Sequence, residues 1–194
     1  MPASTLILAS TSRHRRTLME RLGLPFSAVA PGVDESRSFR EPVEQLVKRL
    51  SRAKAEAVAA GNPGSIIIGS DQAAEREGEI LGKPGDHATA AAQLKAASGK
   101  YMKFHTGLCV IDTRDGRVQE YTDVTRVAFR RLTDTEIERY LQAEKSYDSA
   151  GSFKSEGLGI SLFEGIESND PSALIGLPLI TLCRFLRTSG LELP

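Results

Sequence analysis

Tryptophan is absent from this 194-residue sequence, cysteine occurs only twice, and neither sign of charge is in excess. The 25 Lys and Arg residues are balanced by 25 Asp and Glu residues, so there is no overall positive field of the kind that favours a dedicated nucleic-acid or anionic-membrane binder. Cys109 and Cys183 lie in apolar stretches without CxxC spacing, which excludes a disulfide framework and a zinc site. We expect both to be buried free thiols.

Long apolar segments are also missing. The longest runs, such as residues 66–68 with their neighbours, are far shorter than the ~20 residues that span a bilayer, and the N-terminus lacks a basic flank followed by an apolar stretch. The composition, 40% hydrophobic and 26% charged, excludes collagen-like and wholly disordered chains. These features predict a cytoplasmic protein that folds as a single domain over residues 1–194.

The common motifs of nucleotide and hydrolase chemistry are absent as well. Residues 78–84 (GEILGKP) are one residue short of a P-loop and have Pro where Ser or Thr would hold magnesium. The sequence contains no G-x-G-x-x-G, and its three histidines do not form an HExxH motif. There is no G-x-S-x-G elbow for a serine nucleophile. Zinc hydrolysis and a serine triad are therefore disfavoured.

Alternating helical and extended patterns predict a mixed α/β fold and not a purely parallel, doubly wound one. Asp86 is a good N-cap, Thr133 and Glu136 form a capping box, and Asp115-Gly116 between two β-rich stretches predicts a hairpin. Pro42 is expected at the first position of a helix. The expected strands are 6–9, 26–30, 66–68, 100–111 and 118–129, and the expected helices run from about 13 to 22, 42 to 60, 87 to 98, 134 to 141 and 177 to 186.

The first predicted strand–helix turn has the composition of an anion site. Residues 10–16 (STSRHRR) place hydroxyls, guanidinium groups and free backbone N–H groups at the start of a helix, and all of these bind phosphate. A capped helix with solvated arginines explains the same segment. This turn alone leaves both interpretations open.

Carboxylates and lysines elsewhere supply complementary chemistry. Asp71 follows the apolar run 66–68, which is typical of a strand buried on both faces. A carboxylate in that position is costly unless it is paired, metal-bound or functional. Glu35 lies in a polar loop, and Lys154 lies in the Gly/Ser-rich loop 151–157, which can approach a ligand closely. For Lys54, taken in isolation, a solvated helix face is the simpler interpretation.

Several of these motifs occur in the order seen in one family. The segments LILASTSRHRRTLMERLGLPF, VDES, RAKAEAV, IIGSDQ, LGKP and AGSFKSEGLGI resemble those of the Maf family of nucleoside triphosphate pyrophosphatases, over almost the whole chain. Within that family, the SDQ at residues 70–72 and the FKSEG at 153–157 resemble the subfamily that hydrolyses 7-methylguanosine triphosphate. The dTTP/UTP-hydrolysing relatives typically carry Thr after the catalytic Asp and Gln in the later loop.

The resemblance implies a role for each matching position. The proton acceptor falls on Asp71, and Glu35 and Asp71 are the implied ligands of a divalent Mg²⁺ or Mn²⁺ ion. Arg13 stands where the family usually has Pro, and His14 stands where the subfamily usually has Trp. An imidazole offers a cationic base a smaller stacking face than an indole does. The implied substrate-specificity positions are His14, Gln72 and Glu156, and the implied phosphate-binding positions are Ser10, Arg15, Lys54, Lys83 and Lys154.

The fold that the resemblance implies is a Maf/ITPase-like, two-lobed mixed β-sheet flanked by helices, with the active-site cleft between the lobes. The implied reaction cleaves the α–β phosphoanhydride of a nucleoside triphosphate and releases pyrophosphate. The expected partner is that substrate, with no nucleic acid and no membrane, and a homodimer is left open. A dTTP/UTP-type enzyme and a non-catalytic nucleotide-binding regulator are the alternatives. An RNA-binding module built on residues 13–16 lacks an aromatic platform there.

Overall fold

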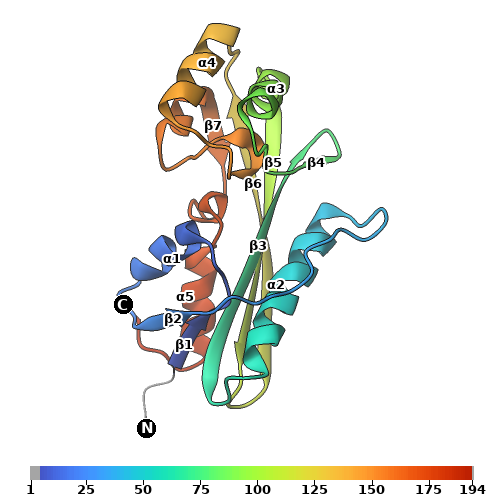
Figure 1. Cartoon of the computed structure of the whole chain (residues 1–194). Helices are drawn as coiled ribbons and strands as arrows, with labels where there is room; N and C mark the ends of the chain where they lie inside the picture. The colour runs from blue at the N-terminus through green and yellow to red at the C-terminus, as the bar shows by residue number, and fades with distance from the viewer. Residues whose placement is uncertain (1–4, 194) are drawn as a thin grey trace. The chain divides into compact units, whose positions relative to one another are not determined.

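The protein is a mixed α/β structure, described here by a computed structural model for residues 5–193. Its seven-stranded sheet has the order β2-β1-β3-β5-β6-β7, and β4 pairs with β3. β1 runs parallel to β2 and β3, whereas the β3–β4 and β6–β7 pairs are antiparallel. Figure 1 shows the elements in chain order, from β1 in blue to α5 in red. The predicted mixed fold is confirmed.

The elements have the following bounds. The strands are β1 (Thr5–Leu8), β2 (Phe26–Ala28), β3 (Ser65–Arg76), β4 (Glu79–Leu81), β5 (Tyr101–Asp112), β6 (Arg117–Phe129) and β7 (Phe163–Glu167). The helices are α1 (Arg13–Glu20), α2 (Val43–Ala59), α3 (His87–Ala97), α4 (Asp134–Ala143) and α5 (Leu179–Thr188). Three short 3-10 helices complete the set, namely η1 (Ala150–Ser152), η2 (Leu158–Leu162) and η3 (Ala173–Ile175).

The chain forms two compact units, each built from separate stretches of sequence. Unit 1 comprises the described residues up to Gln72, Thr106–Asp123 and the described residues from Asp170 onward, and unit 2 comprises Ala73–His105 and Val124–Asn169. The boundaries fall inside β3, β5 and β6 and after β7. Residues distant in sequence therefore share a unit. The single domain expected over residues 1–194 stays a prediction.

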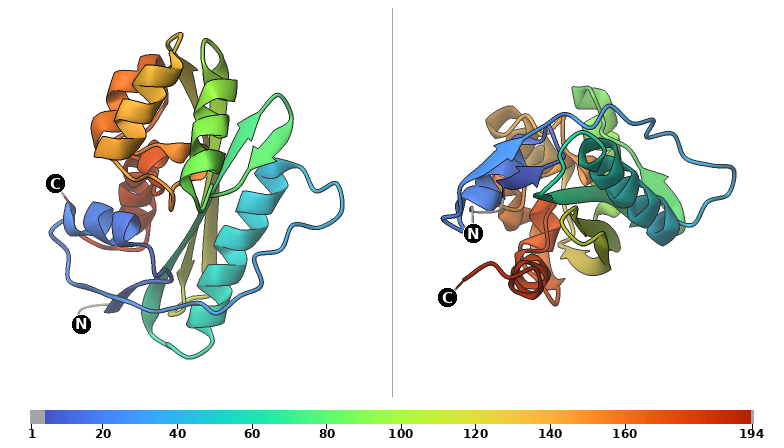
Figure 2. Two further views of the ribbon diagram at one scale, coloured as in Figure 1. Left: turned by 45° about the horizontal axis from the view of Figure 1, so that its top comes forward. Right: turned by 90° about the horizontal axis from the view of Figure 1, so that it is seen from below.

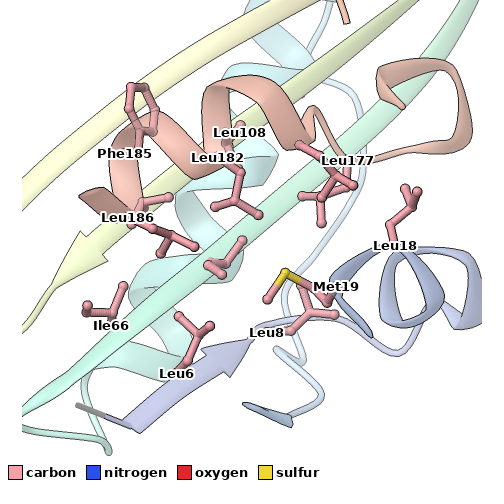
Figure 3. Packing of buried hydrophobic residues seen from close by; sticks show 13 residues of the cluster. Leu6, Leu8, Leu18, Met19, Ile66, Leu108, Leu177, Leu182, Phe185 and Leu186 are labelled. Atoms are coloured by element: carbon pink, nitrogen blue, oxygen red, sulfur yellow. The ribbon is translucent and has the colours of Figure 1, made fainter. Parts of the chain in front are cut away.

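Unit 1 has an apolar layer on each face of its strands, because successive strand side chains point to opposite faces. Leu6, Leu8 and Ile66 pack against α1 and α5 on one face (Figure 3). Ile7 and Ile67 pack against α2 on the other face. Burial on both faces explains why β1 and the start of β3 read as unbroken apolar runs.

Helix α2 lies very close to the sheet. A Cβ atom at Gly69 in β3 would collide with the backbone of Ser51 and Ala55, and one at Gly107 in β5 would collide with the backbone carbonyl of Val47. Only glycine permits this approach. The close packing brings the inner face of α2 against the part of β3 that carries the candidate catalytic residues.

Unit 2 is held together by aromatic rings. Phe153 makes edge-to-face contacts with Phe104, Phe129 and Phe163, at centroid distances of 5.2, 5.6 and 4.8 Å, the geometry that aromatic quadrupoles prefer. Helices α3 and α4 pack against each other in this unit (Figure 2). The aromatic cluster anchors the loop that follows Phe153.

The predicted helix starts at Asp86 and Thr133 are confirmed, and the capping box is complete. Pro42 was expected inside the helix but is the N-cap of α2, and the last helix begins at Leu179, two residues later than predicted. β4 and β7 were not predicted, because both are short, contain no buried residue and lack a clear apolar pattern. Among the described helices, none has an apolar stretch that could cross a bilayer.

Candidate active site

Asp71 lies within β3, not after it. The strand was expected to end near residue 68, but it continues to Arg76, because residues 69–74 remain nearly all buried and Ala74–Arg76 pair with β4. The side chain of Asp71 is only 11% exposed. Its neighbours Ser70 and Gln72 share the opposite face of the strand, since strand side chains alternate. Asp71 is therefore a carboxylate held rigidly at a nearly buried position.

The partner of Asp71 is Lys54 on α2. Lys54 Nζ lies 2.7 Å from Asp71 Oδ1 and 2.7 Å from Glu35 Oε1. The lysine side chain is 5% exposed, so the interpretation of Lys54 as a residue of a solvated helix face is wrong. The ammonium group bridges the two carboxylates that the sequence analysis named as metal ligands.

Two carboxylates that converge on one ammonium group form a cation-binding arrangement. Across residues 5–193, no group of three or more His, Cys, Asp or Glu side chains is placed to hold a metal ion. Mg²⁺ commonly takes only one or two protein carboxylates and completes its shell with water and substrate phosphates. The donor set of Glu35 and Asp71 fits that kind of shared site and not an all-protein cage.

The first turn of α1 is a capped helix start in which serine hydroxyls lie close to a guanidinium group, and its role as an anion site stays a prediction. Ser12 is the N-cap and accepts from the backbone N–H of Arg15. Ser10 Oγ accepts from the backbone N–H of Ser12 at 3.1 Å and from Arg15 Nη1 at 3.4 Å. The guanidinium group is also fixed at its other end, because Arg15 Nε donates to the carbonyl of Gly176 at 2.9 Å.

Arg15 is electrostatically coupled to the carboxylates. Burial lowers the pKa of the Arg15 guanidinium, and the negative charges of Asp71 and Glu35 raise it in opposition. A guanidinium group stays protonated despite such a shift. The site in unit 1 therefore combines two fixed cations, Arg15 and Lys54, with two carboxylates.

Gln72 has a different environment from the one expected of a base-reading residue. Its Nε2 lies 2.8 Å from the carbonyl of Ala173, 3.0 Å from that of Leu174 and 3.0 Å from Thr106 Oγ1. The amide nitrogen is thus directed into the protein. Any contact of Gln72 with a nucleotide base would have to use Oε1.

Three predicted residues belong to unit 2. Lys154 follows the anchored ring of Phe153, and its Nζ lies 3.1 Å from Asp148 Oδ1. Glu156 is exposed in the same loop, and Lys83 is exposed just after β4. Gly151 has a φ of 76°, and a Cβ there would collide with Met102 and Phe104, so the glycine of this loop is a structural requirement.

The structure thus groups the predicted residues in two sets. In unit 1, Ser10 contacts Arg15 directly, and Lys54 contacts both Glu35 and Asp71. His14 is half-buried in the first turn of α1. The roles implied for all of these residues, including Lys83, Lys154 and Glu156, stay predictions.

The sequence analysis missed Ser70 and Gly176 as members of the site. Ser70 is fully buried, with its Oγ 2.9 Å from the Gly176 carbonyl that also accepts from Arg15. The alternation of side chains along a strand would have placed Ser70 on the face of Gln72. No local signal in the sequence identifies the carbonyl of a distant glycine as their shared partner.

Together, the fold and the site define a mixed α/β protein in which two ion-paired carboxylates interact electrostatically with an arginine that is fixed by hydrogen bonds. The family model described as "Maf-like protein" matches residues 5–189. The chain belongs to the Maf family. The resemblance noted in the sequence is therefore confirmed.

Relatives with substantial identity carry a common name. The chain is 53% identical over 191 residues to the "7-methyl-GTP pyrophosphatase" of Burkholderia pseudomallei, a match that covers 97% of this chain and 89% of that protein. It is 50% identical over 187 residues to the protein of that name from Albidiferax ferrireducens, covering 96% and 94%. For the Alcanivorax borkumensis protein of that name, identity is 51% over 190 residues, covering 98% and 96%.

A solved structure supports the fold. The Ham1 protein of Staphylococcus aureus superposes with a TM-score of 0.55 at 12% identity, covering 96% of this chain and 100% of that one. At this level of identity, the similarity extends to the architecture alone. It agrees with the expected Maf/ITPase-like arrangement of a mixed sheet and flanking helices.

Proposed function

We propose that this protein hydrolyses 7-methyl-GTP to 7-methyl-GMP and pyrophosphate. Relatives about 50% identical over nearly the whole chain carry that activity in their name. The observation that carries the proposal is the nearly buried Asp71 on β3, 2.7 Å from Lys54 and electrostatically coupled to Arg15. A substrate of this kind is a small nucleotide of the cytoplasm, where we place the protein.

Asp71 is the proton acceptor in the proposed reaction. Its Oδ1 accepts from Lys54 Nζ, so we assign the incoming proton to Oδ2. Asp71 takes a proton from water as the water oxygen bonds to the α-phosphorus and the α–β bridging bond breaks, with the bridging oxygen leaving on pyrophosphate. General-base catalysis of this type is typically worth ~10²–10⁴-fold in rate.

The cations of the site hold the triphosphate. Arg15 offers a planar set of donors that is suited to phosphate oxygens, and its orientation is fixed by Ser10 and Gly176. Lys54 is ion-paired with both Asp71 and Glu35 in the free protein. We propose Lys83 and Lys154, which belong to unit 2, as further phosphate-binding residues.

We also propose a divalent cation, Mg²⁺ or Mn²⁺, as the cofactor. Glu35 and Asp71 are the residues that would hold it, together with phosphate oxygens of the substrate. The ion would supply charge neutralisation at the phosphates as negative charge builds up on the leaving group.

Glu156 is the proposed reader of the base. Guanine presents N1–H and an exocyclic amine as adjacent donors, which an ionised carboxylate accepts together. A 7-methylguanine ring is also positively charged, so a carboxylate favours it over unmethylated guanine. His14 supplies a smaller stacking surface than an indole would, and we therefore expect a broader substrate range than that of a tryptophan-bearing relative.

The test is a nucleotide panel with identified products. Wild-type protein is incubated with Mg²⁺ and 7-methyl-GTP, GTP, dTTP or UTP, and products are separated by chromatography. We expect monophosphate and pyrophosphate, with the highest kcat/KM for 7-methyl-GTP. A diphosphate as first product excludes the proposed bond cleavage, a preference for dTTP or UTP favours the pyrimidine-specific alternative, and binding without turnover favours the regulator.

Two substitutions refine the same experiment. Asp71→Asn keeps the shape but removes the base, so we expect turnover to fall by ~10²–10⁴-fold with nucleotide binding largely retained. Asp112→Asn, at another buried aspartate in unit 1 that is paired with Arg114, is the control and should leave kcat unchanged.

For recognition of the nucleobase, Glu156→Gln should reduce the preference for 7-methyl-GTP over GTP, whereas Glu164→Gln at an exposed position in β7 should not.

A further inference from the structure

The segment of residues 170–178, here called the C-terminal turn, is closed upon itself by hydrogen bonds. Asp170 Oδ1 accepts from the backbone N–H of Ser172 at 3.0 Å, and Asp170 Oδ2 accepts from the N–H of Ile180 at 2.6 Å. The N–H of Leu179 donates to Ser172 Oγ at 2.8 Å. Because Asp170 and Ser172 are both buried, these bonds fix the turn against the start of α5.

Side chains of β3 hold this turn from outside. Gln72 Nε2 lies within 3.0 Å of the carbonyls of Ala173 and Leu174. Ser70 Oγ lies 2.9 Å from the carbonyl of Gly176 and 2.8 Å from that of Gly107. The hydroxyl has a single proton, so it donates to one of these carbonyls at a time. Ser70 and Gln72 therefore share one face of β3 and one target, whereas Asp71 between them faces Lys54.

The carbonyl of Gly176 is the link to the anion site. It accepts from Arg15 Nε at 2.9 Å, on the edge of the guanidinium group away from Ser10. Gly176 has a φ of 123°, a value that side-chain-bearing residues rarely adopt. The direction of this carbonyl thus depends on the conformation of the turn, and the orientation of Arg15 depends on the carbonyl.

We infer that Ser70 and Gln72 are positioning residues, which fix the C-terminal turn so that the Gly176 carbonyl orients Arg15. This inference depends on the proposed function in one respect: it takes the triphosphate to be the ligand of Arg15. It is an alternative to the base-reading role predicted for Gln72, because both N–H donors of that amide are used by the turn and Thr106, which leaves only Oε1 for a base. A residue that acts through Arg15 affects every triphosphate alike, whereas a base reader changes the ratio between bases.

The first test is spectroscopic and needs no activity. The Nε–Hε resonance of Arg15 is identified in a ¹⁵N-labelled protein as the signal that disappears in Arg15→Lys, and its exchange with water is measured. We expect exchange in Gln72→Met and in Ser70→Ala to be roughly tenfold faster than in wild type, the change that loss of one net hydrogen bond produces. Two variants keep the test decisive if one of them does not fold.

The matched control is Gln119→Met. Gln119 is another glutamine of unit 1 whose Nε2 donates to a backbone carbonyl, but that carbonyl belongs to Phe185 in α5, at 3.2 Å, and not to the C-terminal turn. Its replacement should leave the exchange of Arg15 Hε unchanged. Equal exchange rates in wild type, Gln72→Met and Ser70→Ala, or an equal increase in Gln119→Met, would overturn the inference.

The second test separates positioning from base reading. We expect Gln72→Met to lower kcat/KM about fivefold to tenfold, mainly through KM, and by the same factor for 7-methyl-GTP, GTP and UTP. In the Arg15→Lys background the same substitution should lower kcat/KM little further, because the effects of substitutions at coupled residues are not additive. A changed ratio between nucleotides, or full additivity with Arg15→Lys, would contradict the inference. If wild type turns over no nucleotide, the proposed function fails, while the spectroscopic test still decides the role of Gln72.

Discussion

Replacement of Lys54 by methionine tests the electrostatic centre of unit 1. Methionine keeps much of the length and apolar character of the side chain and removes only the ammonium group. The carboxylate of Asp71 is then left at a position where its side chain is 11% exposed, without its cation 2.7 Å away. Breaking a buried ion pair from one side typically costs ~3–5 kcal/mol, because the remaining charge is uncompensated.

The two carboxylates contribute unequally to this cost. The side chain of Glu35 is 60% exposed, so solvent screens its pairing with Lys54, and an exposed pair is worth ~0–1 kcal/mol. Asp71 therefore dominates, and because it retains a little exposure we take the lower end of the range, about 3 kcal/mol. For a chain of this length, ~2–4 °C per kcal/mol corresponds to a decrease in Tm of about 6–12 °C.

The assay is urea and thermal unfolding of Lys54→Met, Asp71→Asn and the double variant at pH 7. A neutral pair leaves no buried charge, so the double variant should be more stable than Lys54→Met alone, with a coupling free energy of about 2 kcal/mol. Lys48→Met on the same helix is the control, because Lys48 is 58% exposed and lies 3.6 Å from Glu120; it should cost at most ~1 kcal/mol. A loss below 1 kcal/mol for Lys54→Met, or additive effects in the double variant, would refute this reasoning.

Three further outcomes follow from packing and ionisation. Gly107→Ala should lower the free energy of unfolding by ~1–3 kcal/mol in urea titrations, because its Cβ would collide with the backbone of α2, whereas Gly165→Ala, with open space around it, should not. Burial raises the pKa of the Cys109 thiol to about 12, so a thiol reagent at pH 8 should titrate at most one cysteine in the native protein and two after unfolding. Hydrogen bonds from Arg49 lower the pKa of Glu41 to about 2. The ionised Glu41 therefore stabilises the folded state fully above the unfolded pKa of ~4.3, and this contribution is lost as pH falls toward 2. In Glu41→Gln, the free energy of unfolding should accordingly rise less between pH 2 and 5 than it does in wild type.

Parts of the site were predictable because their chemistry is local. Ser12 caps α1 by accepting from the backbone N–H of Arg15, three residues later. This interaction involves neighbouring residues only, so the local sequence indicates it. Asp71 could be identified because a carboxylate next to an apolar run is costly to bury unless it is paired, metal-bound or functional. By contrast, Lys54 reads as an ordinary polar residue of an amphipathic helix, since its distinguishing feature is the pair of carboxylates that meet it from two other segments.

Elements that depend on near neighbours were predictable from the sequence alone, namely the caps at Asp86 and Thr133 and the two-sided burial of β1 and β3. These follow from hydrogen bonds and side-chain periodicity within a few residues. In contrast, the continuation of β3 past Asp71 and the close approach of α2 to Gly69 and Gly107 depend on packing between distant segments. The same holds for the contact between the carbonyl of Gly176 and Arg15, which lie 161 positions apart in the chain. Such contacts are set by packing between distant segments, and backbone groups carry no residue-specific signal that a sequence could display.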